Sequence, residues 1–192
     1  MADKKITELT EVTQVSNSDI LPIVNEGVTK KITVADLVAY NQLGWNRFDD
    51  TVYTSSNKLS LADGVKVTLP NNGGSVVNSG DYTFYDTATN KFLGVNTNDA
   101  YIVTIVFKSS ASNSNNTHLE FSLEGSGDIE RVNQSMAYYK GNDTTQNFHS
   151  LFQYYTDADF VANGVTPKIT AVGGTALIWD IIFFIQRTQR YI

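Results

Sequence analysis

ALIWDIIFFIQRTQRY, residues 176–191, is the stretch that decides the fold, because it can form one long β-strand with apolar residues on both sides. Alternate residues of a strand point to opposite faces. One face would carry Trp179, Ile181, Phe183 and Ile185, and the other would carry Ile178, Ile182 and Phe184. A strand at the surface of a monomeric sandwich needs apolar residues on one face only. The pattern therefore predicts two buried sides, the core of the domain and a second surface.

The second side of this strand can be covered in two ways. Loops of the same domain can close over a central strand, or another copy of the chain can pack there. Burying each large apolar side chain contributes roughly 1.5–3 kcal/mol, so we expect self-association. This predicts a subunit interface at four residues, Ile178, Asp180, Ile182 and Phe184.

Asp180 is the one charge inside this apolar run. It fits a β-bulge, or an ion pair across a subunit interface with Arg187 or Arg190 of a neighbouring chain. An edge position with the carboxylate in water explains it equally well.

The remaining strand signals lie upstream of this stretch. Residues 101–107 are nearly continuously apolar, as in a central strand, whereas residues 118–124 alternate strictly between apolar and polar. Residues 129–139 and 146–155 are rich in aromatic residues, and residues 168–172 precede the Gly173-Gly174 turn. Because no helical stretch separates these segments, the sequence predicts an all-β fold, a jelly-roll β-sandwich.

The chain divides into three predicted parts. Residues 1–45 form an N-terminal segment, residues 46–80 a connector with the first short strands, and residues 81–192 the jelly-roll head. The N-terminal segment should contain a β-hairpin, with strands near 19–24 and 28–32, followed by a short helix that begins at Thr33. Such a segment is too small to bury a core of its own, so we expect it to pack on another protein. Its candidate contact residues are Ile20, Leu21, Ile23, Val34 and Leu37.

Composition excludes several classes of function. The chain has 192 residues, a formal net charge of −6 and no cysteine. The charge argues against binding to nucleic acid or anionic membranes, and the lack of cysteine excludes disulfides and cysteine-ligated zinc. The charged start of the sequence, residues 1–5, is not followed by the apolar stretch of a signal peptide. The most apolar run, residues 176–185, is too short to span a membrane and contains Asp180. We therefore expect synthesis in a cytoplasm, without export through a classical signal.

No catalytic, cofactor or metal site is predicted. His118 and His149 lie on separate predicted strands, and the acidic pairs Asp49-Asp50 and Asp157-Ala-Asp159 are explained by turn chemistry. The chain lacks a nucleophile elbow, a phosphate-binding loop and a dinucleotide fingerprint. Tyr154 and Tyr155 can line a sugar-binding groove, since aromatic faces stack on apolar sugar faces, although core packing is the commoner use of such residues.

One resemblance concerns residues 5–37. The stretches Lys5-Ile-Thr-Glu-Leu9, Asp19-Ile-Leu-Pro-Ile-Val24 and Gly27-Val-Thr-Lys-Lys-Ile-Thr-Val-Ala-Asp-Leu37 resemble the N-terminal segment of tail-fibre and head-fibre proteins of tailed bacteriophages. In that family the segment looks like an attachment module in front of an exposed domain. The resemblance implies that this segment binds another virion protein, in the capsid or in the tail or baseplate.

The C-terminal part is similar in pattern to trimeric jelly rolls of the tumour-necrosis-factor and C1q type. We therefore expect a homotrimeric bacteriophage virion structural protein, a short fibre, spike or capsid-decoration protein on the virion surface, assembled in the host cytoplasm. The alternative is a tail-fibre-type receptor-binding protein that recognises host surface glycan. A capsule depolymerase is a third possibility, but no convergent acids support it, and we expect no enzymatic activity.

Overall fold

The computed structural model describes residue 16 and residues 18–25, 28–34, 43–73, 75–79, 82–113, 116–139 and 145–190. The chain divides into two compact units, Met1–Gln42 and Leu43–Ile192.

The described part of the first unit is a β-hairpin. Strands β1 (Ile20–Asn25) and β2 (Val28–Thr33) pair antiparallel from Ile20 opposite Thr33 to Asn25 opposite Val28. This confirms the hairpin that the sequence predicts. The helix expected after Thr33 falls almost wholly outside the described residues.

The second unit is a β-sandwich. One sheet contains six strands in the order β12-β9-β14-β3-β6, with β4 also paired to β14, and the other has the order β11-β10-β13-β5. The strands of the first sheet are β3 (Trp45–Asp49), β4 (Leu59–Leu61), β6 (Ser75–Ser79), β9 (Ala100–Ala111), β12 (Gln146–Tyr155) and β14 (Ala176–Gln189). Those of the second are β5 (Val67–Thr68), β10 (His118–Glu124), β11 (Glu130–Ala137) and β13 (Thr166–Val172). A short pair, β7 (Tyr85–Asp86) and β8 (Lys91–Phe92), a 3-10 turn, η2 (Ser126–Asp128), and one helix, α2 (Ala158–Asn163), complete the described elements.

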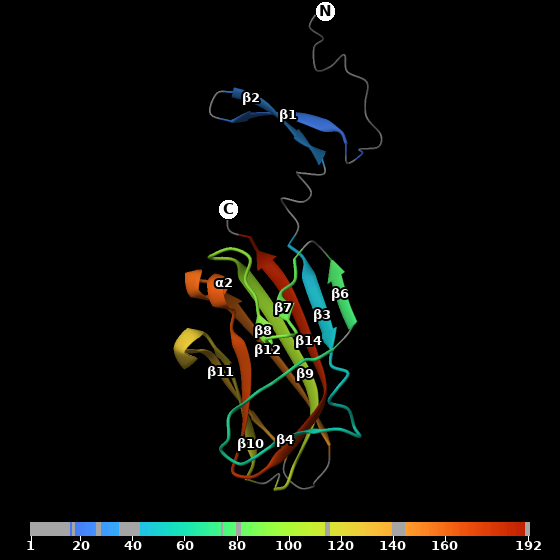
Figure 1. Ribbon diagram of the computed structural model, residues 1–192, viewed down its shortest axis with the longest axis vertical. Helices are drawn as coiled ribbons and strands as arrows, with labels where there is room; N and C mark the ends of the chain where they lie inside the picture. The colour runs from blue at the N-terminus through green and yellow to red at the C-terminus, as the bar shows by residue number, and fades with distance from the viewer. Residues whose placement is uncertain are drawn as a thin grey trace, which may run out of the picture. The chain divides into compact units, whose positions relative to one another are not determined.

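The order of the strands makes this sandwich a jelly roll. The chain changes sheet between β9 and β10, between β11 and β12, and at each of the next two connections, whereas β10 and β11 form a hairpin within one sheet. The last strand, β14, lies between β9 and the first strand of the sandwich, β3. Figure 1 shows β9 and β14 running side by side through the unit. The predicted fold class is confirmed.

Residues 46–80, expected to be a connector with the first short strands, contribute strands to the sandwich. They supply β3 and β4 to the edge of β14, and β5 to the edge of β13. The boundary between the compact units also lies at residue 43. Short strands carry few residues of alternating pattern, so their pairing with strands more than 100 positions away is hard to see in the sequence.

The space between the sheets is filled mainly by aromatic side chains. Alternation along β9 and β12 places Val103, Ile105 and Phe107 on the inner side, opposite Phe152, Ser150 and Phe148. Tyr85 contacts Phe183 edge to face, with ring centroids 5.1 Å apart. Such contacts add to the stabilisation from apolar burial.

Strand β14 contains a β-bulge at Asp180. Trp179 pairs with Lys108 and Ile182 pairs with Val106, so two residues of β14 oppose one residue of β9. Asp180 has a positive φ of 54°, the left-handed conformation that such a bulge uses. The extra residue shifts the alternation, so that both Ile178 and Ile181 point into the core and are fully buried.

The bulge corrects two assignments. Ile178 was expected at a subunit interface, but it belongs to the core cluster. Trp179 was expected on the core face, but it pairs with the exposed Lys108 and lies outside the core cluster. Its ring is 4% exposed, and the ammonium group of Lys58 lies 4.1 Å from the ring centroid. Residues preceding β4 therefore cover one end of the strand's second side.

Arg187, one of the two basic residues expected to reach Asp180 of a neighbouring chain, pairs within its own chain. Arg187 is fully buried, and its Nη2 atom lies 2.6 Å from Oδ2 of Asp99, which is also fully buried. Breaking one partner of such a pair costs about 3–5 kcal/mol, because a charge stays buried alone. Arg187 is thus committed to its own subunit, and the described partner of Asp180 is Lys108, at 2.9 Å.

The bulge predicts that two substitutions of Asp180 differ in their effect on the free energy of unfolding. Asp180→Val should lower the free energy of unfolding by about 1–3 kcal/mol, because a β-branched residue is strained at positive φ. Asp180→Gly should stay within about 1 kcal/mol of the wild type, since glycine adopts this conformation freely. Urea unfolding measures both. Both variants lose the contact with Lys108, so equal stabilities would contradict the bulge.

Candidate functional site

The outer face of the six-stranded sheet carries an apolar strip along its centre. Cross-strand pairs point to the same face, and the register places Phe184 beside Thr104 and Ile182 beside Val106. The strip, which we call the outer strip, consists of Trp45, Ile102, Val106, Ile182 and Phe184, all partly accessible to solvent. Trp45 and Phe184 stack with their ring centroids 5.5 Å apart.

Charged residues lie directly beside the outer strip and pair within the chain: Arg47 and Asp49 of β3 are the register partners of Phe184 and Ile182. Arg47 Nε lies 2.9 Å from Oδ1 of Asp49 on β3, and Lys108 Nζ lies 2.9 Å from Oδ2 of Asp180 beyond the bulge. Since these ions are matched, the centre of the face presents apolar surface without a net charge. The arrangement of an apolar centre with a polar border is typical of protein–protein interfaces.

Sequence reasoning found part of this face. Ile182 and Phe184 lie on the outer strip, and Asp180 lies at its border, as expected. Sequence reasoning missed Trp45, Ile102 and Val106. Whether a residue of β3 or β9 belongs to the outer strip depends on how these strands pair with β14. Residues 101–107 are apolar at nearly every position, so their sequence did not show which face of this strand points outward.

Tyr154 and Tyr155 lie on opposite sides of β12. Tyr154 is 8% exposed, and its ring stacks on Tyr101 and Phe160 with centroid distances of 5.2 and 4.8 Å. Burial raises the pKa of its phenol well above the usual value, so the hydroxyl stays protonated. Tyr154 is therefore a core residue, which corrects its expected role as an exposed glycan contact. Tyr155 is 69% exposed and is available to a ligand.

A cleft of about 390 Å³ opens beside these residues, where β11 and β12 approach α2. Its lining residues are Leu123, Arg131, Val132, Gln153, Tyr154, Tyr155 and Phe160. The hydroxyl of Tyr154 and Nε of Arg131 are shielded from solvent and have no hydrogen-bond partner among the described residues. We call this feature the β11–β12 cleft.

Arg131 is held rigidly at this cleft by two carboxylates. Its Nη1 donates to Asp157 at 2.6 Å and its Nη2 to Asp159 at 2.7 Å. The bond from Arg131 is the main cause of a lowered pKa at Asp157. Bonds from Ser126, Asn163 and Arg131 lower the pKa of Asp159 to about 2. Asp157 also caps α2 by accepting a bond from the Phe160 backbone N–H at 2.8 Å.

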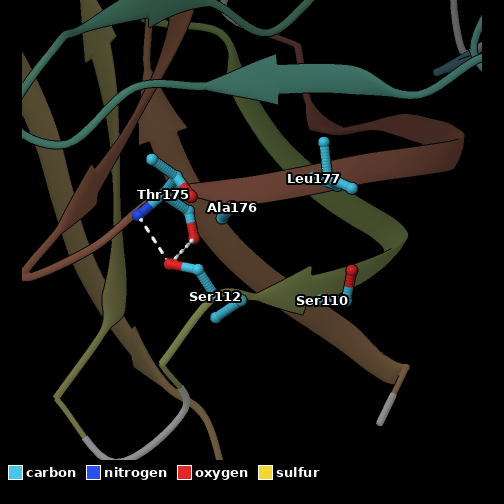
Figure 2. Close-up of a pocket in the computed structure, with 6 residues that line it drawn as sticks. Ser110, Ser112, Thr175, Ala176 and Leu177 are labelled. Carbon is cyan, nitrogen blue, oxygen red and sulfur yellow. Dashed lines mark hydrogen bonds between the residues drawn. The ribbon is translucent and has the colours of Figure 1, made fainter. Parts of the chain in front are cut away.

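A second hollow, of about 360 Å³, lies at the ends of β9 and β14 and is shown in Figure 2. Its hydroxyl groups include those of Ser110, Ser112 and Thr175. The Ser112 hydroxyl accepts a bond from the Thr175 backbone N–H at 3.1 Å and donates one to the Thr175 carbonyl at 3.2 Å. This hydroxyl therefore joins the two strand ends and is not free for a ligand.

The structure does not bring the histidine and acidic residues considered as metal ligands into one cluster among the described residues. Within the described ranges, no group of three or more His, Asp or Glu side chains is placed to hold a metal ion. His118 lies 3.3 Å from Glu120 on its own strand. The described residues contain no helix with the length and apolar character needed to cross a membrane.

Among the expected attachment residues, Ile20 and Leu21 are 55% and 42% exposed, and Val34 is half-buried. Ile20 and Leu21 are consecutive, so they point to opposite faces of the hairpin. Leu37 and the side chain of Ile23 lie outside the described residues. The described hairpin thus offers apolar surface on both faces.

No protein-family model matches this sequence, and no curated protein matches it. Among solved structures, the vertex protein P5 of PRD1 is similar over 97% of this chain and 91% of its own, with 11% identity and a TM-score of 0.47. The Eiger TNF of S. frugiperda is similar over 78% and 94%, with 8% identity and a TM-score of 0.46. A xylan-binding module, CBM15, is similar over 77% and 93%, with 20% identity and a TM-score of 0.35. These similarities include a TNF-type protein and a phage vertex protein, and they assign no ligand or partner to this chain.

The clamp on Arg131 predicts a pH effect. Both carboxylates have lowered pKa values in the folded protein, so they bind fewer protons than in the unfolded chain, where the pKa of Asp is about 3.9. The two ionised carboxylates therefore contribute fully to the free energy of unfolding above about pH 4, and this contribution is lost as the pH falls towards 2.

Arg131→Gln should raise the pKa of Asp157 in an NMR titration and make stability less dependent on pH between about 4 and 2. Arg47→Gln, on β3 of the six-stranded sheet, is the matched control, because Arg47 pairs with Asp49 and not with the clamp. An unchanged Asp157 titration in Arg131→Gln would contradict the clamp.

Proposed function

We propose that this chain forms a homotrimer that serves as a structural protein of a bacteriophage virion, as a short fibre, spike or capsid-decoration protein. In this proposal the N-terminal unit binds another virion protein, in the capsid or in the tail or baseplate. The jelly roll faces outward from the particle. The proposal assigns no reaction and no cofactor to the chain.

The outer strip is the observation that carries the proposed assembly. On this face Ile182 lies beside Val106 of β9, and Phe184 stacks on Trp45 of β3. The charged β3 partners of these two residues, Asp49 and Arg47, are already paired with each other. A second copy can bury this surface without leaving an ion unpaired, which keeps the cost of association low. The number of subunits comes from the resemblance of the head to trimeric jelly rolls.

The N-terminal unit supports the attachment to a particle. Residues 5–37 resemble the attachment segment of phage fibres, and the hairpin exposes Ile20, Leu21 and Val28. An isolated two-stranded hairpin is marginally stable in water. Packing of these side chains on a virion protein would bury them and stabilise the hairpin.

Recognition of a host surface glycan is the second candidate function. The exposed ring of Tyr155 beside the β11–β12 cleft favours it. This function is compatible with a virion structural role, because an outward-facing head can also be a receptor-binding domain.

The assembly proposal predicts the effect of charges on the outer strip. Ile182→Asp and Phe184→Asp should each convert the trimer to folded monomers, because burying an unpaired carboxylate at an interface is unfavourable. Light scattering after size exclusion measures the mass, and circular dichroism checks folding. Ile129→Asp, at a position that is 62% exposed near β11, should leave the trimer intact. A folded trimer of both outer-strip variants would contradict the proposed interface.

The attachment proposal predicts a separate effect in the hairpin. The double substitution Ile20→Asp and Leu21→Asp should abolish incorporation into phage particles, because two charges would replace apolar contacts. The oligomeric state of the purified protein should not change. The conservative pair Ile20→Val and Leu21→Met is the control. Immunoblotting of particles from a complementation experiment measures incorporation, and normal incorporation of the Asp variant would refute this role.

A further inference from the structure

The β11–β12 cleft lies where the outermost strands of the two sheets meet. β11 ends one sheet and β12 ends the other. Away from α2, side chains join the two strands: the Ser150 hydroxyl bonds to Gln134, and Gln146 bonds to the backbone of Tyr139. Among the described residues, no such bond joins Arg131 or Val132 to β12. The cleft opens at this end, in the gap between the strands.

The lining combines an apolar interior with polar groups at its border. Leu123, Val132 and Phe160 supply apolar surface, while Gln153 and Tyr155 are exposed on β12. The amide of Gln153 has no described hydrogen-bond partner, so both its donor and its acceptor are available to a ligand. A volume of about 390 Å³ is within the usual range for small-molecule sites.

The charge of the cleft decides which ligands fit. The positive charge of Arg131 is shared by Asp157 and Asp159, which leaves these three side chains with a net negative charge. This net charge would repel an anionic ligand. The accessible groups are instead the amide of Gln153 and the phenol and ring face of Tyr155, which suit a neutral ligand with many hydroxyl groups.

Buried polar atoms point to the same chemistry. Tyr154 is more than nine-tenths buried, its ring lines the cleft, and its hydroxyl lacks a partner. Buried polar groups in native proteins are generally hydrogen-bonded, and an unsatisfied one costs about 1–3 kcal/mol. A water molecule, or a hydroxyl group of a ligand that reaches the interior of the cleft, would give the Tyr154 hydroxyl a partner.

From these observations we infer that the β11–β12 cleft binds a neutral saccharide of one or two sugar rings, with a ring face stacked on Tyr155 and its hydroxyl groups bonded to Gln153. This inference deepens the second candidate function and rests on it. The lining residues all belong to one chain. Gln153 is the register partner of Ile102 of the outer strip, so the cleft opens next to the proposed subunit interface.

The test is an NMR titration of the full-length protein with two sets of sugars at millimolar concentrations. The neutral set contains lactose, cellobiose, maltose and their monosaccharides, and the acidic set contains glucuronic acid and sialyllactose. At least one neutral sugar should shift the signals of Gln153, Tyr155 and Arg131. Tyr155→Ala should weaken this binding at least tenfold. Tyr139→Ala should not, although Tyr139 is 84% exposed at the other end of the same pair of strands.

Three results would overturn the inference: no shift of the cleft signals with any neutral sugar, tighter binding of the acidic sugars, or equal weakening by the two tyrosine substitutions. The titration reads the cleft of each chain, whereas light scattering reads the assembly. A failure of sugar binding is therefore distinct from a failure of the trimer.

Discussion

The β-bulge at Asp180 is the constraint on which the rest of the head depends. Without it, strict alternation along β14 would place Ile178 and Phe184 on the same side of the sheet. One extra residue allows Ile178, Ile181, Phe183 and Ile185 all to enter the core. The same residue leaves Ile182 and Phe184 on the outer face. A positive φ at a single non-glycine position thus divides the apolar residues of one strand between two surfaces.

The division explains why this strand is apolar along its length. Its core side closes the sandwich, where β14 lies between β9 and β3. Its second side is not uniform, since Trp179 is covered by Lys58 of the same chain whereas Ile182 and Phe184 are partly accessible. Only the second part is surface that another subunit can use. The proposed interface therefore includes less of β14 than the sequence suggested, and it extends instead onto the neighbouring strands β3 and β9.

Periodicity in the sequence was enough to predict the fold class. Residues 118–124 alternate with period two, and Leu119, Phe121 and Leu123 are buried as expected. The hairpin in residues 19–33 has a turn signal between two short strands. Neither inference needed knowledge of distant contacts.

The site was harder to predict, because it depends on pairing between residues far apart in the sequence. Nothing near Arg187 indicates that Asp99 neutralises it, since the two lie 88 positions apart and meet only through the register of β9 and β14. Tyr154 and Tyr155 are chemically identical neighbours, and only the orientation of β12 decides which is buried. A bulge at Asp180 was one of three readings of a charge in an apolar run. Choosing among them requires the conformation of the backbone.

The central claim is that sister chains bury the outer strip. The most direct measurement is the solvent accessibility of Phe184 in an experimental structure of the purified, assembled protein. The account predicts that Phe184 and Ile182 are buried by neighbouring copies around a threefold axis. Solvent over both side chains in the assembled protein would contradict it.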